Sequence, residues 1–227
     1  MAVERNLELD GGLVRVRGGN VSIKLGDIAR EAAGIPGYPL PKGLGPGQPG
    51  LEQTAHFMPT GLAYSNAAHA VEVEVDPATG AVRILRYVVV SDCGQQINPM
   101  IVEGQITGGV VHGIGNALFE RMHYDETAQP LSTNFADYLL PTATELPRIE
   151  LFSHVSPSPL NPLGVKGVGE CGVIPAAAAI ISAIEHALDA FGIRIVETPI
   201  SPARIVELVN SASSATTAPI ARMRSTS

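Results

Sequence analysis

Two runs of alternating apolar and polar residues, joined by a short turn, constrain the fold of this chain most strongly. In residues 69–76, one histidine and then valines alternate with alanine and acidic residues, which is the period of a half-buried β-strand. Asp76–Gly80 follows as a turn, because proline suits its second position and Gly80 can adopt the left-handed conformation of a bulged hairpin. Residues 82–90 return as a second strand, and their Val-Val-Val run predicts burial on both faces. We therefore expect an antiparallel hairpin.

Other segments also show helix or strand patterns, although each of these patterns is weaker than that of the hairpin. The predicted helices are 25–33, 101–122, 175–190 and 203–209, and the further predicted strands are 13–16, 21–23 and 149–155. The strands before residue 35 have no evident partner sheet of their own. Residues 34–53 are rich in glycine and proline, which predicts a long loop. Residues 210–227 contain too few apolar side chains to fold, so we expect a disordered tail.

The predicted helix at 101–122 carries an unusual number of glycines. Each costs up to about 1 kcal/mol relative to alanine in a helix interior. Four of them fall in two pairs at i, i+4 spacing, Gly104 with Gly108 and Gly109 with Gly113. Such spacing flattens one face, so that another backbone or a ligand can lie against it. Packing against a neighbouring helix and ligand binding explain the spacing equally well.

The amino-acid composition limits the possible binding partners and the cellular compartment of the protein. The 227 residues are 45% hydrophobic with a net charge of −7, so the chain can bury a core but offers no basic stripe for nucleic acid. No apolar run reaches the roughly 20 residues of a membrane-spanning helix. The N-terminal segment also lacks a secretory pattern. Cys93 and Cys171 form no CxxC motif, and the histidines lack metal-ligand spacing, so we expect no zinc or iron–sulfur site in this chain. We also expect both cysteines to be reduced and the protein to be cytoplasmic.

Residues 164–175 (GVKGVGECGVIP) place one carboxylate, Glu170, in a loop with four glycines directly before a predicted helix. Glycine allows close approach of another molecule, and a carboxylate within hydrogen-bond reach of a proton can act as a general base. The dipole of the following helix is expected to favour the ionised form, whereas burial opposes it. A surface or capping glutamate is the commoner role for an acid before a helix, but the flanking glycines favour a ligand site.

Further polar residues are candidates for binding. Gln105 lies in the first turn of the glycine-rich helix, and its amide suits a heterocycle or an oxo group, although a solvated amide fits the spacing as well. Lys166 is able to pair with a phosphate or with Glu170, or to remain solvated. His69, His112 and His123 have the chemistry for proton transfer; for His112, within the glycine-rich helix, we expect packing instead.

The order of the motifs resembles a known family. They are AVEVEVD at 70–76 with TG at 79–80, DCG at 92–94, INP at 97–99, EGQI at 103–106, the glycine run at 109–115, DYLLPT at 137–142 and KGVGE at 166–170. This succession, over residues 1–209, resembles the C-terminal part of the molybdopterin-binding large subunit of the xanthine dehydrogenase, aldehyde oxidase and aerobic carbon monoxide dehydrogenase family. The resemblance implies an α+β fold in which a mixed sheet packs against helices.

The resemblance also implies a mechanism. In the family, the glutamate of the Gly-x-Gly-Glu motif removes the proton of a molybdenum-bound hydroxide, whose oxygen attacks an electron-poor carbon of an aldehyde or N-heterocycle. Glu170 matches that glutamate and is thereby implied as the catalytic base. The residues implied to lie beside the cofactor are Gln105, Lys166, Gly167, Val168 and Gly169. The cofactor would be molybdenum-molybdopterin, in its plain or its cytosine dinucleotide form.

The family's large subunit is several times longer than this sequence. Its upstream loops hold the rest of the pterin and shape the substrate pocket, so we expect that this chain alone does not retain the cofactor. The implied partners are the upstream part of the large subunit, an iron–sulfur subunit with 2Fe-2S clusters, an FAD subunit and a small-molecule substrate. We expect a partial molybdopterin-binding domain at 1–209, as a piece of a split subunit. The alternative is a truncated, catalytically incompetent fragment with an assembly or structural role.

Overall fold

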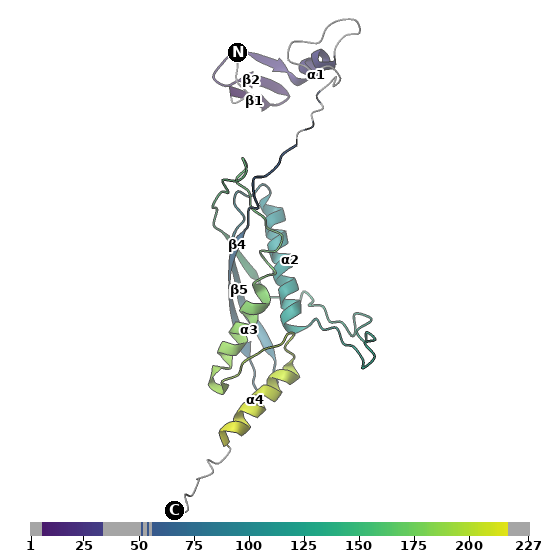
Figure 1. Ribbon diagram of the computed structural model, residues 1–227. Helices are drawn as coiled ribbons and strands as arrows, with labels where there is room; N and C mark the ends of the chain where they lie inside the picture. Colours follow the sequence, from purple (N-terminus) through teal and green to yellow (C-terminus); the bar gives the residue numbers. More distant parts are fainter. Residues whose placement is uncertain (1–5, 34–50, 52–53, 55, 218–227) are drawn as a thin grey trace, which may run out of the picture. The chain divides into compact units, whose positions relative to one another are not determined.

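The computed structural model describes residues 6–33, 51, 54 and 56–217 of the chain. They belong to two compact units, Met1–Met58 and Pro59–Ser227, each of which is described by itself (Figure 1). The loop predicted at 34–53 lies almost wholly outside the described residues, as does 218–227. Within the described part, no helix is long and apolar enough to cross a membrane.

The first unit contains a small sheet and one helix. Its elements are β1 (Leu7–Asp10), β2 (Leu13–Val16), β3 (Ser22–Lys24) and α1 (Leu25–Ala33). The three strands pair antiparallel in the order β1-β2-β3. The expectation that the early strands lack a sheet of their own was therefore wrong. The overlooked strand is β1, which joins β2 through Gly11 and Gly12, both at positive φ, in an Asp-Gly turn that is typical of hairpins.

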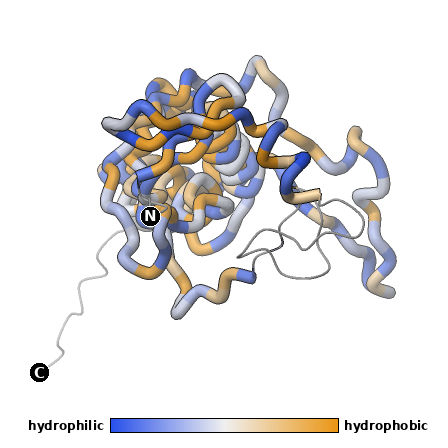
Figure 2. The backbone as a smooth tube through the Cα atoms, turned by 90° about the horizontal axis from the view of Figure 1, so that it is seen from above, coloured by the Kyte–Doolittle hydropathy of each residue, from blue (hydrophilic) through white to orange (hydrophobic). Residues whose placement is uncertain are grey.

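The second unit is built on a mixed three-stranded sheet. β4 (Asn66–Val75) and β5 (Val82–Asp92) form the predicted antiparallel hairpin, with Gly80 at φ +72° in the turn. β6 (Ile149–Ser153) lies parallel to β5 on its other side. Exposed and partly buried residues alternate along the whole of β4, as a sheet covered on one face requires. Figure 2 shows hydrophobic and hydrophilic residues interspersed along the chain.

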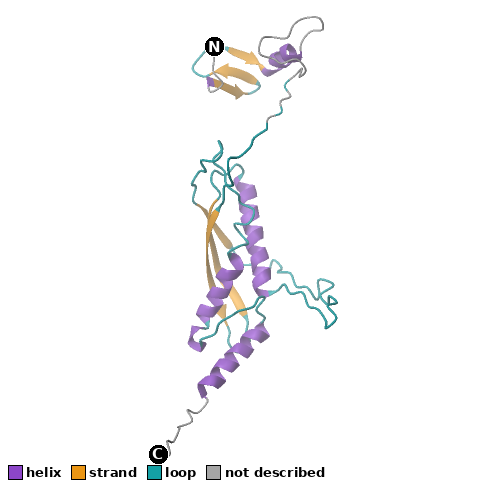
Figure 3. Cartoon of the chain, viewed as in Figure 1, coloured by secondary structure: helices purple, strands orange, loops and turns teal. Residues whose placement is uncertain are grey.

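Helices cover one face of this sheet (Figure 3). The helices of this unit are α2 (Pro99–Leu118), α3 (Ala176–Ala187), the short 3₁₀ helix η2 (Asp189–Phe191) and α4 (Pro202–Thr217). α3 packs on β4 and α2 packs on α3, whereas α4 packs on η2. The core joins Tyr87 and Val89 of β5 to buried residues of α2, α3 and α4. Val90 on the opposite face is 39% exposed, so the burial on both faces predicted for the Val-Val-Val run was wrong. The helices lie on the Tyr87 face, and Val90 points away from it.

The four glycines of α2 at i, i+4 spacing divide into two sets. A Cβ added at Gly113 would lie 2.2 Å from the Cβ of Ala176 on α3, and one added at Gly109 would meet Gly172 at 2.9 Å. These glycines therefore serve close packing. A Cβ added at Gly104 or Gly108 would meet nothing within 4 Å, so that stretch of α2 presents bare backbone.

Several element ends differ from those predicted. α2 begins at Pro99, with Asn98 accepting a hydrogen bond from the Ile101 N–H, and ends at Leu118 rather than near residue 122. α4 continues to Thr217, well past the predicted end at 209 and into the segment expected to be disordered. Serine hydroxyls donate to carbonyls four residues earlier there, as Ser211 does to Glu207, so the polar composition is compatible with a helix.

Candidate functional site

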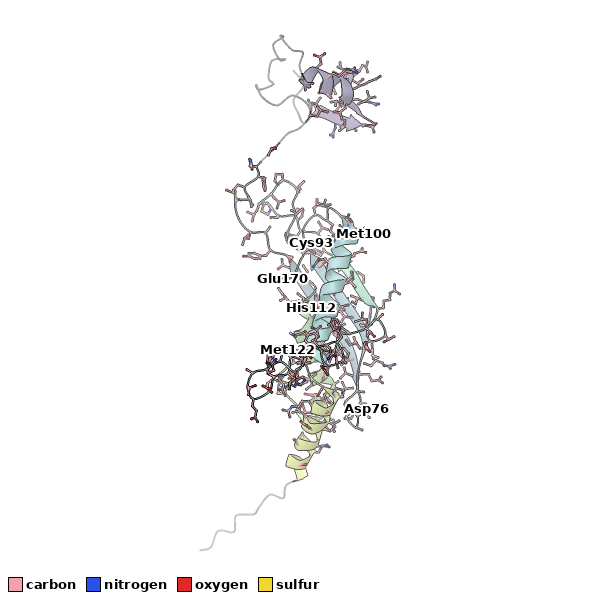
Figure 4. The ribbon with its side chains drawn as sticks, turned by 90° about the vertical axis from the view of Figure 1, so that its right-hand side faces the viewer. Asp76, Cys93, Met100, His112, Met122 and Glu170 are labelled. Carbon is pink, nitrogen blue, oxygen red and sulfur yellow. The ribbon has the colours of Figure 1, made fainter. Side chains whose placement is uncertain are left out.

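Glu170 lies in a turn between an extended segment and α3. The extended segment is held at both edges, because Lys166 N–H donates to the Cys93 carbonyl (2.8 Å) and Gly167 N–H donates to the Ala63 carbonyl (3.0 Å). The turn itself is closed by hydrogen bonds from the Val173 and Ile174 N–H groups to the Glu170 carbonyl, both 3.2 Å. In Figure 4, Glu170 lies between Cys93 and His112 along the length of the unit.

The Glu170 side chain is exposed, and among the described residues no hydrogen bond or ion pair reaches its carboxylate. α3 begins only at Ala176, and a helix dipole acts within about one turn of the helix end. Glu170 therefore lies six residues before the first residue of α3. The carboxylate remains available to a ligand.

A pocket of about 460 Å³ lies beside Glu170. One wall is the backbone and side chains of 167–171 with Ile174 and Pro175, and the other wall is the segment Ala63–Ala67, which leads into β4. The structure thus brings Gly167, Val168 and Gly169 together with Glu170 around one cavity. Sequence reasoning missed the wall at 63–67, because nothing local in those residues indicates a partner a hundred positions away.

Gln105 reaches the same loop from α2. Its Nε2 donates to the Gly169 carbonyl at 3.0 Å, which identifies the nitrogen, since a carbonyl oxygen only accepts. A Cβ added at Gly169 would meet nothing within 4 Å, so the backbone there is open. The structure places Gln105 beside the glutamate loop, with its amide nitrogen engaged by the protein.

Lys166 does not line the pocket beside Glu170. Its Nζ pairs with Asp92 Oδ2 at 2.7 Å, and both side chains are nearly buried. Asp92 Oδ1 also accepts from the Gly94 and Ser156 N–H groups, at 2.9 and 3.2 Å. The hydrogen bond from Lys166, followed by the one from Gly94, lowers the pKa of Asp92 to about 2. Lys166 therefore ties the start of the loop to the end of β5.

The three candidate histidines differ in their surroundings. His69, on β4, hydrogen-bonds Tyr87 through Nδ1 (2.9 Å) and the Cys171 carbonyl through Nε2 (3.0 Å). His112 is exposed on α2, so the packing role expected for it was wrong; α2 packs through Gly113 next to it (Figure 4). His123 is exposed in the segment after α2. Both cysteines are free and buried, and burial raises the pKa of Cys93.

Two glycines of this loop, Gly169 and Gly172, allow a direct test of how closely the loop packs against α2. A Cβ added at Gly172 would lie 2.2 Å from the Ile106 carbonyl oxygen of α2, whereas Gly169 has open space. We expect Gly172→Ala to destabilise the protein by about 1–3 kcal/mol, the usual range for overpacking. Gly169→Ala is the matched control in the same loop and should change stability little. Urea unfolding measures both, and equal effects of the two substitutions would refute the packing.

Comparisons with known proteins identify the family of this chain. A family model described as a molybdopterin cofactor-binding domain matches residues 1–147. The gamma subunit of the 6-hydroxypseudooxynicotine dehydrogenase complex of Paenarthrobacter nicotinovorans is 40% identical over 88% of this chain and 25% of its own length. The carbon monoxide dehydrogenase large chain of Hydrogenophaga pseudoflava is 37% identical over 81% of this chain and 22% of its length. The structure of quinoline 2-oxidoreductase from Pseudomonas putida 86 superposes with a TM-score of 0.81 and 37% identity, over 92% of this chain and 26% of that one.

The chain belongs to the molybdopterin cofactor-binding domain family and corresponds to the C-terminal part of its large subunits. It spans about a quarter of the length of the curated relatives it matches. The α+β fold with a mixed sheet and packed helices is that of the solved large subunits. The matched range of the family model includes Gln105 but ends before the Glu170 loop.

The residues of the pocket fit one side of such a cofactor. In the part of the chain that the structure describes, no group of three His, Cys, Asp or Glu could hold a metal ion, and a metal carried by a pterin does not require one. What the pocket does offer is open backbone at Gly169 and the free carboxylate of Glu170. Gln105 does not itself line the pocket; its amide holds the Gly169 carbonyl from the α2 side.

Proposed function

We propose that this chain supplies the catalytic base and one wall of a molybdopterin-dependent hydroxylase site. The observation that carries the proposal is the free carboxylate of Glu170 at a pocket, in a chain of the molybdopterin-binding family. The other walls of the site come from protein outside this sequence, since the relative with 40% identity is about three and a half times as long. The reaction class is conversion of a substrate C–H to C–OH with oxygen from water, which releases two electrons and two protons.

The role proposed for Glu170 is proton transfer. Its carboxylate accepts the proton of the water-derived nucleophile as the oxygen attacks an electron-poor carbon, and a carboxylate so placed contributes about 10²–10⁴-fold to a rate. When bound, the molybdenum cofactor supplies the two-electron oxidation. Gln105 and the backbone of 167–169 orient the pterin, while Lys166 holds this loop through Asp92.

The proposed substrate is an N-heterocycle or an aldehyde. Nicotine and quinoline, which are N-heterocycles, appear in the names of two of the similar proteins. The electrons pass to 2Fe-2S clusters and FAD on partner subunits, a proposal supported by relatives that are named as subunits of larger assemblies. The upstream part of the large subunit is the partner that completes the pocket.

Reconstitution with metal analysis tests this function. The chain would be produced together with an upstream large-subunit part and the iron–sulfur and flavin subunits, and molybdenum would be measured by mass spectrometry. We expect close to one molybdenum per complex, which is lost when this chain is omitted, and turnover of N-heterocycles. A complex without molybdenum, or one that holds it equally well without this chain, would favour a purely structural fragment instead.

A further inference from the structure

The two carbonyls on either side of Glu170 each accept a hydrogen bond from a side chain of a different element. Gln105 of α2 donates to the carbonyl of residue 169 at 3.0 Å, and the ring of His69 on β4 meets the carbonyl of residue 171 at 3.0 Å. A backbone held at both neighbours of Glu170 fixes where its Cβ points. Of the two donors, Gln105 is exposed, whereas His69 is half-buried and backed by a further buried residue.

That further residue is Tyr87 of β5. Its side chain is fully buried, and its ring packs edge-on against His69 with centroids 5.6 Å apart. The Tyr87 hydroxyl lies 2.9 Å from His69 Nδ1, in the core of the unit. A buried hydroxyl without a partner is costly, so this contact strongly determines the orientation of the imidazole.

The chemistry of the partners determines the direction of both hydrogen bonds. A carbonyl oxygen only accepts, so His69 Nε2 carries a hydrogen that it donates to Cys171. In the neutral ring Nδ1 is then an acceptor, and the Tyr87 hydroxyl donates to it. Burial lowers the pKa of His69, against the opposing effect of the Cys171 carbonyl, which agrees with a neutral ring. The chain of donors runs from Tyr87 through His69 to the Glu170 loop.

On the far side of the loop, α2 prevents the loop from moving away from β4. The Cα of Gly172 packs on Ile106 and Gly109 so closely that a Cβ has no room. The peptide that carries the Cys171 carbonyl therefore lies between α2 and the imidazole of His69. Neither the loop nor the ring can move independently, because each is in contact on both sides.

We propose that His69 and Tyr87 are positioning residues, which hold the Cys171 carbonyl and thereby aim the Glu170 carboxylate into the pocket. The inference rests on the proposed role of Glu170 as the base. His69 does not transfer the proton itself in this arrangement, since both ring nitrogens are engaged by protein groups. Its effect is on the geometry of the base, and a displacement of about 1 Å in a catalytic group can cost about a hundredfold in rate.

The first test uses the full chain without cofactor. Nitrogen-15 NMR of the histidine rings should show His69 as the neutral Nε2–H tautomer, with the exposed His112 as a reference ring in water. Hydrogen exchange of the Val173 and Ile174 amides, which bind the Glu170 carbonyl, should accelerate about tenfold in His69→Leu, as expected when a local opening becomes easier. His69→Gln keeps a donor and an acceptor and should preserve the protection. A charged or Nδ1–H ring, or unchanged exchange in His69→Leu, overturns the inference.

Tyr87→Phe covers the case in which His69→Leu does not fold. It retains the ring packing and removes only the hydroxyl, so circular dichroism should be unchanged while exchange at 173 and 174 still increases. If exchange is unchanged in a folded Tyr87→Phe, Tyr87 has no positioning role and the proposal fails for that residue.

The second test uses the complete molybdenum-loaded enzyme. We expect His69→Leu to lower kcat about tenfold to a hundredfold with little change in KM, and His69→Gln to recover most of the loss. In a Glu170→Gln background, His69→Leu should not lower kcat further, because the catalytic base whose position it affects is already absent. An equal loss in that background overturns the positioning role. If Glu170→Gln alone retains full turnover, the proposed function fails instead, and the NMR and exchange results still decide the contact.

Discussion

Replacing Glu170 by glutamine is expected to lower kcat of the complete enzyme by about 10²–10⁴-fold, the usual contribution of a general base. Glutamine has nearly the same size, but its amide does not take up a proton at neutral pH. The Glu170 carboxylate has no partner among the residues that the structure describes, so its loss leaves no buried group unpaired. Stability and molybdenum content should therefore stay as they are, and steady-state kinetics with metal analysis measures both.

Glu126→Gln is the control for this substitution. Glu126 is exposed in the segment after α2 and does not line the pocket, so the same loss of charge there should leave kcat unchanged. Full turnover in Glu170→Gln would refute the assignment of the base. Loss of molybdenum in that variant would instead show that Glu170 acts in holding the cofactor.

The hairpin could be predicted from sequence because its determinants are local. Alternation over 69–76, the turn at Asp76–Gly80 and the return over 82–90 specify β4 and β5 without reference to the rest of the chain. Asp76 even accepts hydrogen bonds from the Ala78 N–H and the Thr79 hydroxyl within its own turn. The same holds for α1, whose bounds match the prediction.

The loop around Glu170 could be located from sequence, but the groups that hold it could not. Lys166 and Asp92 are separated by 74 positions, and His69 and Cys171 by 102. No periodicity or motif pairs such distant residues, and each side chain taken alone is consistent with a solvated role. The choice between packing and ligand binding for the glycines of α2 also depended on α3, which brings Ala176 against Gly113.

Burial on the outer face of the sheet was mispredicted for a related reason. A continuous apolar run indicates that a strand is covered on both sides, and the described residues cover β5 on the Tyr87 side. On the opposite face, Val90 of β5 and its neighbour Phe152 of β6 are 39% and 54% exposed. The composition of a strand shows how apolar it is, but which element covers each face depends on the three-dimensional packing.

The ion pair between Asp92 and Lys166 is expected to make the protein sensitive to acid. Folding lowers the pKa of Asp92 from its ordinary value of 3.8 to about 2. A carboxyl group with a depressed pKa contributes its full stability above the unfolded pKa, and that contribution is lost as the pH falls through the folded one. Stability measured by urea unfolding should thus decrease between about pH 4 and pH 2, and Asp92→Asn should flatten this decrease.

At neutral pH, Asp92→Asn should cost about 3–5 kcal/mol, because it leaves the nearly buried Lys166 ammonium without a counter-charge. Lys166→Met added to it removes that charge and should restore much of the loss, since an apolar pair of similar volume replaces a buried ion pair at little cost. Glu74→Gln, which breaks the exposed pair with Arg83, is the control and should have little effect. If the effects of Asp92→Asn and Lys166→Met simply add, the two groups are not coupled, and the start of the Glu170 loop is held by its backbone contacts alone.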